Sequence, residues 1–198
     1  MSKPRIVGLT GTHGTGKSTI INGVAELGYK VNQAQLSRAA QKALGWETLS
    51  LAQESKENMW ALQDAILEAM FDRDQEALST GDIVLVERTP ADMWAYAEMW
   101  CRRLNIDPVT NPSAIRYKHY CRDLAKNYCR FLIVPSTEAV KFVAEPNRAD
   151  LESRQFVELA INEFIESGNL PATVIKATGI VARINEAQTA MCIEKVKQ

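Results

Sequence analysis

The feature that most constrains this chain is a glycine-rich segment near its start, GTHGTGKS at residues 11–18. It follows a short apolar run at 5–10 and precedes a helical pattern that ends at Gly28. Glycines let the backbone curl so that successive N–H groups point inward, and the lack of side chains lets an anion approach closely. The first turn of the following helix adds the positive end of its dipole. The segment therefore predicts an anion-binding turn between a strand and a helix.

The spacing of the glycines, the lysine and the serine fits G-x-x-x-x-G-K-[ST], the Walker A pattern of nucleotide-binding loops. We expect Lys17 to reach the β- and γ-phosphates of ATP and the Ser18 hydroxyl to ligate Mg²⁺. His13 is expected to lie near phosphate as a loop residue rather than as a base. The residues predicted to contact the nucleotide here are Gly11, Thr12, His13, Gly14, Thr15, Gly16, Lys17, Ser18 and Thr19.

Apolar segments typical of strands alternate with helical patterns along the chain. The predicted strands are 5–10, 29–32, 82–87, 130–134 and 172–176. The predicted helices are 17–27, 34–44, 51–79, 90–104, 113–127, 150–167 and 180–195. This alternation predicts a parallel sheet covered on both faces. We expect an α/β fold of the P-loop NTPase type, a three-layer sandwich with strand order 2-3-1-4-5 and ligands at the carboxyl edge of the strands.

The length of 198 residues predicts one domain, residues 1–198. The segments 105–115 and 135–150 are expected to be mobile loops, since both combine proline with polar residues.

A candidate lid covers residues 135–155, because Arg148 precedes a predicted helix and Arg154 lies in its first turns. Phosphoryl transfer spreads negative charge over the equatorial oxygens, and arginines neutralise such charge with fixed geometry. Nucleotide kinases and ribosylnicotinamide-kinase-like proteins carry arginines in a similar place. Alternatively, Arg154 forms a surface ion pair with Glu158 four residues later.

Glu87 ends the apolar segment 82–87 at the sheet edge where the glycine loop is expected to emerge. A carboxylate there can hold Mg²⁺ or orient the hydroxyl of a phosphate acceptor. Arg88 follows directly, and its side chain is expected to diverge from that of Glu87 because side chains alternate along a strand. It is predicted to contact a substrate phosphate or the transferring group, unless it is an ordinary surface arginine.

The triplet Glu87-Arg88-Thr89 resembles the E-R-S element of deoxyribonucleoside kinases, which a helix also follows. In that family the glutamate–arginine pair lies beside the phosphates and the substrate. The resemblance implies the same position for Glu87 and Arg88. Asp92 resembles an acid in the helix of that family, which implies a substrate contact.

The segment 28–46 occupies the place where many P-loop kinases of the AAA-like, ribosylnicotinamide-kinase-like group carry an acidic base before an arginine. This chain has Gln33 and Gln35 before Arg38, and a glutamine accepts no proton at neutral pH. Either Glu87 is the base, or transfer needs little base help, or the substrate is not a standard one. Gln35 and Arg38 are predicted to contact the acceptor. The stretch SRAAQKALGW resembles bacteriophage deoxynucleoside monophosphate kinases.

The segment 174–188 resembles the last strand, glycine loop and arginine-bearing helix that contact adenine in many nucleotide kinases. The resemblance implies that Gly179 and Arg183 lie at the adenine. Alternatively, this helix only packs against the sheet.

Two helical segments raise the question of macromolecular partners. In 57–78 the spacing of the apolar residues predicts core packing or the interface of a homodimer. Within 116–130, basic residues with interleaved tyrosines are typical either of a DNA contact or of a solvated helix face. The basic residues are Arg116, Lys118, Arg122, Lys126 and Arg130. P-loop kinases of phages that phosphorylate 5-hydroxymethyluracil in DNA are a precedent for the DNA contact.

The net charge of −1 gives no bulk attraction to nucleic acid or membranes, and apolar runs such as 83–86 are too short to cross a bilayer. Four cysteines without a CxxC spacing predict reduced thiols. We therefore expect a cytoplasmic protein, in the host cytoplasm if a phage encodes it, with no membrane partner.

Three functional hypotheses follow. The first is a kinase that uses ATP and Mg²⁺ to phosphorylate a nucleoside, a nucleotide or a nucleotide-like acceptor. The second is a kinase for 5-hydroxymethyluracil in DNA. The third is a nucleotide-binding switch with slow hydrolysis, which the missing acid of the second strand favours.

Overall fold

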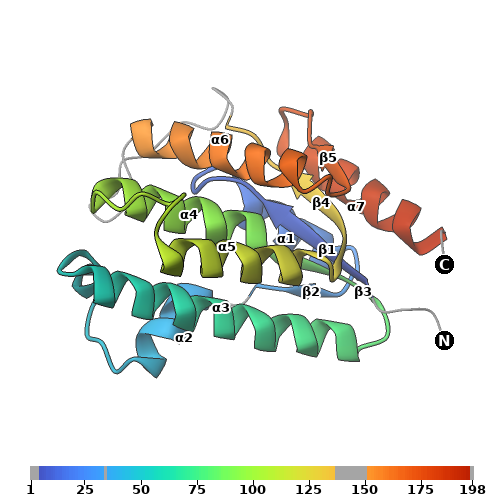
Figure 1. Ribbon diagram of the computed structural model, residues 1–198. Coiled ribbons are helices and arrows are strands. Elements are labelled where there is room, and N and C mark those ends of the chain that lie inside the picture. The colour runs from blue at the N-terminus through green and yellow to red at the C-terminus, as the bar shows by residue number, and fades with distance from the viewer. Residues whose placement is uncertain (1–4, 34, 137–150, 197–198) are drawn as a thin grey trace.

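A central parallel sheet organises the molecule (Figure 1). The computed structural model describes residues 5–33, 35–136 and 151–196. Its five strands lie in the order β2-β3-β1-β4-β5, and every neighbouring pair is parallel. The strands are β1 (Arg5–Thr10), β2 (Val31–Asn32), β3 (Ile83–Glu87), β4 (Tyr128–Ile133) and β5 (Ala172–Val174). The predicted fold class and strand order are confirmed.

Helices cover both faces of the sheet, with α1 and α7 on one face and α3, α4, α5 and α6 on the other (Figure 1). The helices are α1 (Lys17–Glu26), α2 (Leu36–Ala43), η1 (Leu49–Gln53, a 3₁₀ helix), α3 (Lys56–Ser79), α4 (Pro90–Arg103), α5 (Pro112–Ala125), α6 (Leu151–Ser167) and α7 (Ile180–Val196).

Alternating side chains of the central strands divide the core into two clusters. In β3, Val84 and Val86 pack into the cluster beneath α3 to α6, whereas Leu85 packs into the cluster beneath α1 and α7. In β4, Phe131 packs into the cluster beneath α3 to α6, and Leu132 packs into the cluster beneath α1 and α7. Because both faces are buried, these strands are continuous apolar runs.

Side-chain caps explain where two long helices begin. Ser55 accepts a hydrogen bond from the backbone of Asn58 at the start of α3. Asn111 accepts from the backbone of Ser113 and of Ala114 at the start of α5. Of the segment 105–115 that the sequence assigned to a mobile loop, residues 112–115 are therefore the first turn of α5, in agreement with the overlapping helix prediction for 113–127. Of the other predicted loop and the candidate lid, residues 137–150 lie outside the described residues, and residues 151–155 belong to α6.

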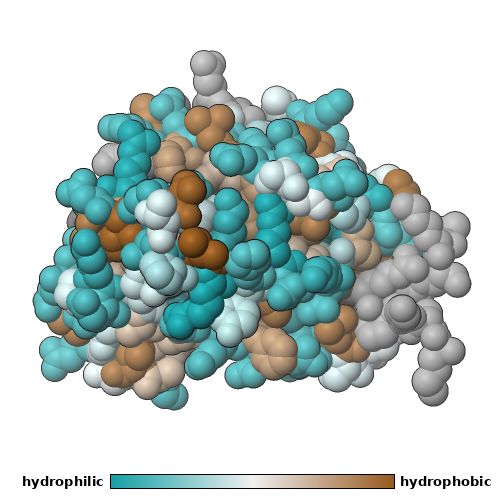
Figure 2. Space-filling model, viewed as in Figure 1, coloured by the Kyte–Doolittle hydropathy of each residue, from teal (hydrophilic) through white to brown (hydrophobic). Residues whose placement is uncertain are grey.

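The two expectations about macromolecular partners concern the helical face shown in Figure 2, where hydrophobic residues lie in small groups among hydrophilic ones. On α3, Met59, Leu62, Ile66, Leu67 and Met70 are buried in the core, which accounts for the apolar spacing of that helix without a second subunit. The homodimer stays a prediction. No helix within the described residues is long and apolar enough to cross a membrane.

Candidate active site

The glycine loop joins β1 to α1 at the carboxyl edge of the sheet. Gly14 and Gly16 adopt φ values of 71° and 87°, in the left-handed region that favours glycine. Gly11 lies against β4, where an added Cβ would come within 2.4 Å of the Val134 carbonyl oxygen. Backbone curvature and close packing therefore require glycine at these positions, as an anion-binding nest does.

Lys17 folds back over the loop. Its Nζ donates a hydrogen bond of 2.7 Å to the Gly11 carbonyl, one of 3.3 Å to Thr15 Oγ1, and a third to the Thr12 carbonyl. Burial, together with the smaller effect of the neighbouring Arg88, lowers the pKa of Lys17 to about 7, although the carboxylates of Asp92 and Glu87 act in the opposite direction. Within the part of the chain that the structure describes, its ammonium group donates to carbonyl and hydroxyl oxygens and to no carboxylate. A bound phosphate would supply the negative charge that this group lacks.

Glu87 and Ser18 meet beside the loop, as the sequence predicted for a magnesium site. The Ser18 hydroxyl donates a hydrogen bond of 3.1 Å to Glu87 Oε1. Hydroxyl and carboxylate oxygens are ligands that Mg²⁺ accepts, usually together with substrate phosphates. Among the described residues, no group of three or more His, Cys, Asp or Glu side chains could hold a metal ion. These two residues therefore fit a magnesium ion that takes its other ligands from phosphate and water.

Arg88 turns towards the glycine loop and does not continue β3. Its φ is 72°, so the chain bends sharply after Glu87. Its Nη1 donates to the Gly11 carbonyl at 3.2 Å and to Asp92 Oδ1 at 3.1 Å. The expected divergence of Glu87 and Arg88 does not occur, because the alternation of a strand ends at this bend. Both side chains lie at the loop.

Asp92 is buried, and both of its oxygens are occupied. Oδ1 accepts from the Gly11 amide at 3.3 Å and from Arg88, and Oδ2 accepts from the Thr89 amide at 2.8 Å and the Thr89 hydroxyl at 2.9 Å. With Thr89 it forms the capping box at the start of α4. Asp92 therefore holds the glycine loop to α4, and the substrate contact that the resemblance implies stays a prediction.

Arg154 reaches the glycine loop from α6 and is only 4% exposed. Its Nε donates to Thr12 Oγ1 at 3.3 Å and to Ser136 Oγ at 3.0 Å. Glu158, the suggested surface partner, accepts a hydrogen bond from the Ser136 amide at 3.1 Å. Arg154 is therefore a buried neighbour of the loop rather than a surface residue. Arg148, its predicted companion, lies outside the described residues.

Arg183 approaches the loop from α7. Its Nη1 donates to the Thr15 carbonyl at 2.9 Å and its Nε to the Ala177 carbonyl at 2.8 Å. The side chain is 1% exposed, so its guanidinium supports the loop from within and does not present an open surface to adenine. Gly179 accepts the backbone hydrogen bond of Arg183 in the first turn of α7. The implied adenine contact of Gly179 and Arg183 stays a prediction.

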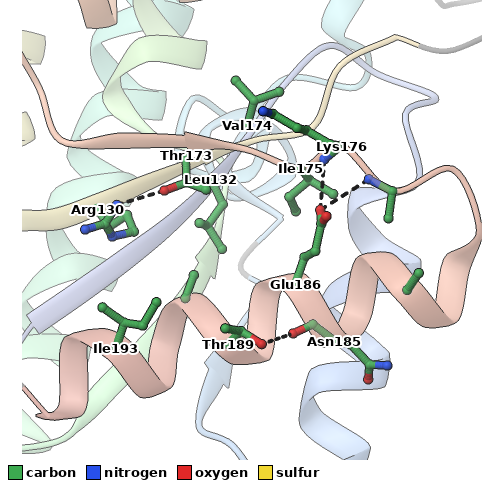
Figure 3. Close-up of a pocket in the computed structure, with 13 residues that line it drawn as sticks. Arg130, Leu132, Thr173, Val174, Ile175, Lys176, Asn185, Glu186, Thr189 and Ile193 are labelled. Atoms are coloured by element: carbon green, nitrogen blue, oxygen red, sulfur yellow. Dashed lines mark hydrogen bonds between the residues drawn. The ribbon is translucent and has the colours of Figure 1, made fainter.

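A pocket of about 540 Å³ lies nearby, between α7 and the strands β4 and β5 (Figure 3). Leu132, Ile175 and Ile193 contribute to its mainly apolar lining, and Glu186 holds the backbone of Lys176 and Ala177 beside it. No residue of the glycine loop lines it. This pocket is therefore separate from the predicted phosphate site.

Gln35 and Arg38, the residues predicted to bind the acceptor, make no observed contact with the glycine loop within the described residues. Gln35 precedes the first turn of α2, and Arg38 lies in that turn; both are exposed. Gln33 donates a hydrogen bond of 2.5 Å to Asn22 Oδ1 of α1. Contact of Gln35 and Arg38 with an acceptor stays a prediction.

The basic residues of α5 and β4 make contacts within the chain. Arg116 pairs with Asp64, Lys126 with Asp123 and Arg130 with Glu194, at 2.9, 2.6 and 2.7 Å. Lys118 lies 4.7 Å from the centre of the Trp94 ring, and Arg122 donates to the Phe164 carbonyl and to Ser167. The DNA contact stays a prediction, and these interactions account for the residues without it.

Tyr96 is a site residue that the sequence did not single out. Its hydroxyl accepts a hydrogen bond of 3.2 Å from the His13 amide and lies 3.1 Å from His13 Nδ1. The guanidinium carbon of Arg88 lies 5.2 Å from the centre of its ring. Its position one helical turn after Asp92 on α4 was the available signal, since residues four apart share a helix face.

Comparisons with known proteins agree with this fold. The family model described as "AAA domain" matches residues 6–183. No curated protein sequence matches the chain significantly. Among solved structures, deoxyadenosine kinase from M. mycoides with bound dATP shares 15% identity at a TM-score of 0.67, covering 94% of this chain and 98% of that one. Thymidylate kinase from Ehrlichia chaffeensis shares 12% identity at a TM-score of 0.63, covering 96% and 99%.

A third solved structure, NadR protein in complex with NR, is similar to this chain over only part of its own length. It shares 15% identity at a TM-score of 0.64, covering 89% of this chain and 47% of that one. At such identities the three structures show a common fold.

Proposed function

Because the chain belongs to the AAA domain family and has the fold of P-loop nucleoside and nucleotide kinases, we propose that it is a Mg²⁺-dependent kinase of that kind. It transfers the γ-phosphoryl group of ATP to a nucleoside, a nucleotide or a nucleotide-like acceptor. Bound ATP would supply the phosphoryl group, and Mg²⁺ would neutralise part of its charge.

The observation that carries the proposal is the convergence of three cationic side chains and one carboxylate on the glycine loop. Lys17, Arg88 and Arg154 each donate hydrogen bonds to loop atoms from a different helix or strand end. The loose transition state of phosphoryl transfer carries charge on its equatorial oxygens, which such a cluster stabilises.

The chain's own residues divide the work. The loop amides and Lys17 bind the phosphates, while Ser18 and Glu87 hold the metal. Arg88 and Arg154 stabilise the transferring group. Glu87 also orients the acceptor hydroxyl, since Gln33 and Gln35 replace the acid of the second strand.

The test is incubation of the protein and Mg²⁺ with γ-labelled ATP and a panel of nucleosides, nucleoside monophosphates and DNA containing 5-hydroxymethyluracil. Label on a free nucleoside or nucleotide supports the proposal, whereas label on the DNA alone favours the second hypothesis. Tight binding of ATP without transfer to any acceptor contradicts the proposal and favours a nucleotide-binding switch.

A further inference from the structure

A buried arginine outside the glycine loop contacts the backbone from which Glu87 and Arg88 project. Arg73 lies in α3 and is 3% exposed. Its Nη1 donates to two successive carbonyls, that of Glu87 at 2.6 Å and that of Arg88 at 3.0 Å. Successive carbonyls of a strand point in opposite directions. They converge on one nitrogen here because the chain bends at Arg88.

This bend is costly without support. A left-handed conformation is unfavourable at a residue other than glycine, because Cβ comes too close to the following carbonyl oxygen, and Arg88 adopts a φ of 72°. The carbonyls at the end of β3 also need hydrogen-bond donors once the strand ladder stops. Arg73 satisfies both carbonyls from one rigid, planar group, so it favours the bent backbone over an extended one.

The other two nitrogens of the Arg73 guanidinium are also hydrogen-bonded. Its Nε and Nη2 donate to Asp74 Oδ1 at 2.9 and 2.6 Å, and Nη2 also donates to the Tyr128 hydroxyl at 2.7 Å. The Tyr128 hydroxyl in turn donates to Asp74 Oδ2 at 2.8 Å. All five donors of Arg73 are therefore used. The cluster of Arg73, Asp74 and Tyr128 forms a fixed support beneath the bend.

We propose that Arg73 is a positioning residue for phosphoryl transfer: by binding the carbonyls of Glu87 and Arg88, it aims one side chain at Ser18 and the other at the glycine loop. This inference rests on the proposed function. Arg73 acts through the backbone of the two residues and touches neither substrate nor metal. Its loss should therefore impair the metal-dependent step more than the binding of phosphate by the loop itself.

The first variant is Arg73→Lys, which keeps a cation beside Asp74 but lacks the planar fork that reaches both carbonyls. We expect kcat to fall about 10- to 100-fold, the range that misplacement of reacting groups by about 1 Å produces. The KM for ATP should change less than kcat. In calorimetry, the gain in ATP affinity on adding Mg²⁺ should shrink, while the affinity without Mg²⁺ stays within about twofold of wild type.

The matched control is Tyr128→Phe, which removes a hydroxyl from the same cluster and leaves both carbonyl contacts intact. It should lower the melting temperature and keep kcat and the Mg²⁺ effect near wild type. If Arg73→Lys does not fold, Arg73→Met combined with Asp74→Leu removes the buried pair together, an exchange that folded proteins often tolerate.

The inference is overturned if the folded Arg73 variant keeps the wild-type kcat and Mg²⁺ effect, or if Tyr128→Phe loses both equally. Should the wild-type protein bind ATP and Mg²⁺ but transfer no label, the proposed function fails, and the Mg²⁺ effect alone decides the role of Arg73. A wild-type protein that binds no nucleotide contradicts both.

Discussion

Two buried cationic side chains near the carboxyl edge of the sheet, Arg73 and Lys17, differ in the groups that surround them. Arg73 meets the carboxylate of Asp74, a tyrosine hydroxyl and two carbonyls. Lys17 meets two carbonyls and a hydroxyl, and the carboxylate of Asp92 nearby is occupied by other donors. A buried charge that lacks an ionised partner is expensive. The neutralised cation therefore belongs to the framework, whereas the cation without a bonded carboxylate agrees with the phosphate site that we propose.

The largest effect is expected when the charge of Lys17 is removed. Lys17→Met should abolish phosphoryl transfer, with a loss of about a thousandfold or more, because the phosphates lose their ammonium partner. The same variant should unfold at a higher temperature than wild type when no nucleotide is present at pH 7, since burial of the charge no longer opposes folding. Labelled-product assays and thermal melts measure the two effects.

The matched control is Lys42→Met, which removes an exposed lysine from the last turn of α2. It should keep both activity and melting temperature. Retained transfer in Lys17→Met would contradict the proposed role of Lys17 in binding the phosphates, and a lower melting temperature would contradict the difference between the two buried cations.

The second test concerns the carboxylate beside Ser18. Glu87→Gln should lower kcat by about a hundredfold or more, because an amide binds Mg²⁺ more weakly and accepts no proton. Steady-state kinetics across a range of Mg²⁺ concentrations should show a raised requirement for the metal. A variant with wild-type kcat and metal dependence would remove Glu87 from the site.

The third test follows the protonation of Lys17. Its pKa is about 7 in the folded chain and 10.5 as the ordinary value. Between these values the unfolded chain binds more protons, so the free energy of unfolding should rise as the pH increases from 7 to 10.5. Below pH 7 the penalty for the buried charge is fully present. Chemical denaturation of wild type and Lys17→Met should therefore diverge most at low pH and converge near pH 10.5.

Nucleotide binding should reverse this shift, because phosphate restores the charged form of Lys17. Calorimetry at pH 8 in buffers of different ionisation enthalpy should show uptake of protons with ATP by wild type and not by Lys17→Met if the variant binds. Equal uptake in both proteins would assign the protons to another group.

The smallest expected effect belongs to Tyr96. Tyr96→Phe removes the hydroxyl that accepts from the His13 amide but keeps the ring beside Arg88. One hydrogen bond contributes about 1 kcal/mol, so kcat/KM for ATP should fall about fivefold. The control is Tyr29→Phe, which removes a hydroxyl that is hydrogen-bonded to Cys192 of α7. A Tyr96 variant that behaves like this control would limit Tyr96 to a packing role.

Local patterns predicted the fold and the central part of the site. The glycine spacing at 11–18 and the alternation of strands with helices depend on neighbouring residues, so strand order and the meeting of Ser18 with Glu87 followed from them. Arg154 lies at the loop, and its role in phosphoryl transfer stays a prediction.

The remaining features depend on partners that are distant in the sequence. Arg73 meets Tyr128 across 55 positions and Arg183 meets Thr15 across 168, and no periodicity indicates such pairs. In the segment 57–78 only the apolar spacing was interpreted, and it gives no sign that the charged residues Arg73 and Asp74 are buried. The resemblance to deoxyribonucleoside kinases implied a substrate contact for Asp92, which stays a prediction, and the capping box that Asp92 forms with Thr89 was not recognised in the sequence.

The hydrogen bond from Arg183 to the Thr15 carbonyl joins α7, the last helix, to the glycine loop that follows the first strand. A ribosome finishes the glycine loop early and delivers α7 only after nearly every other element has emerged. The nascent chain therefore contains the loop long before it contains the arginine that stabilises the loop. We expect the ability to bind a nucleotide to appear late in translation, once α7 has packed against the loop.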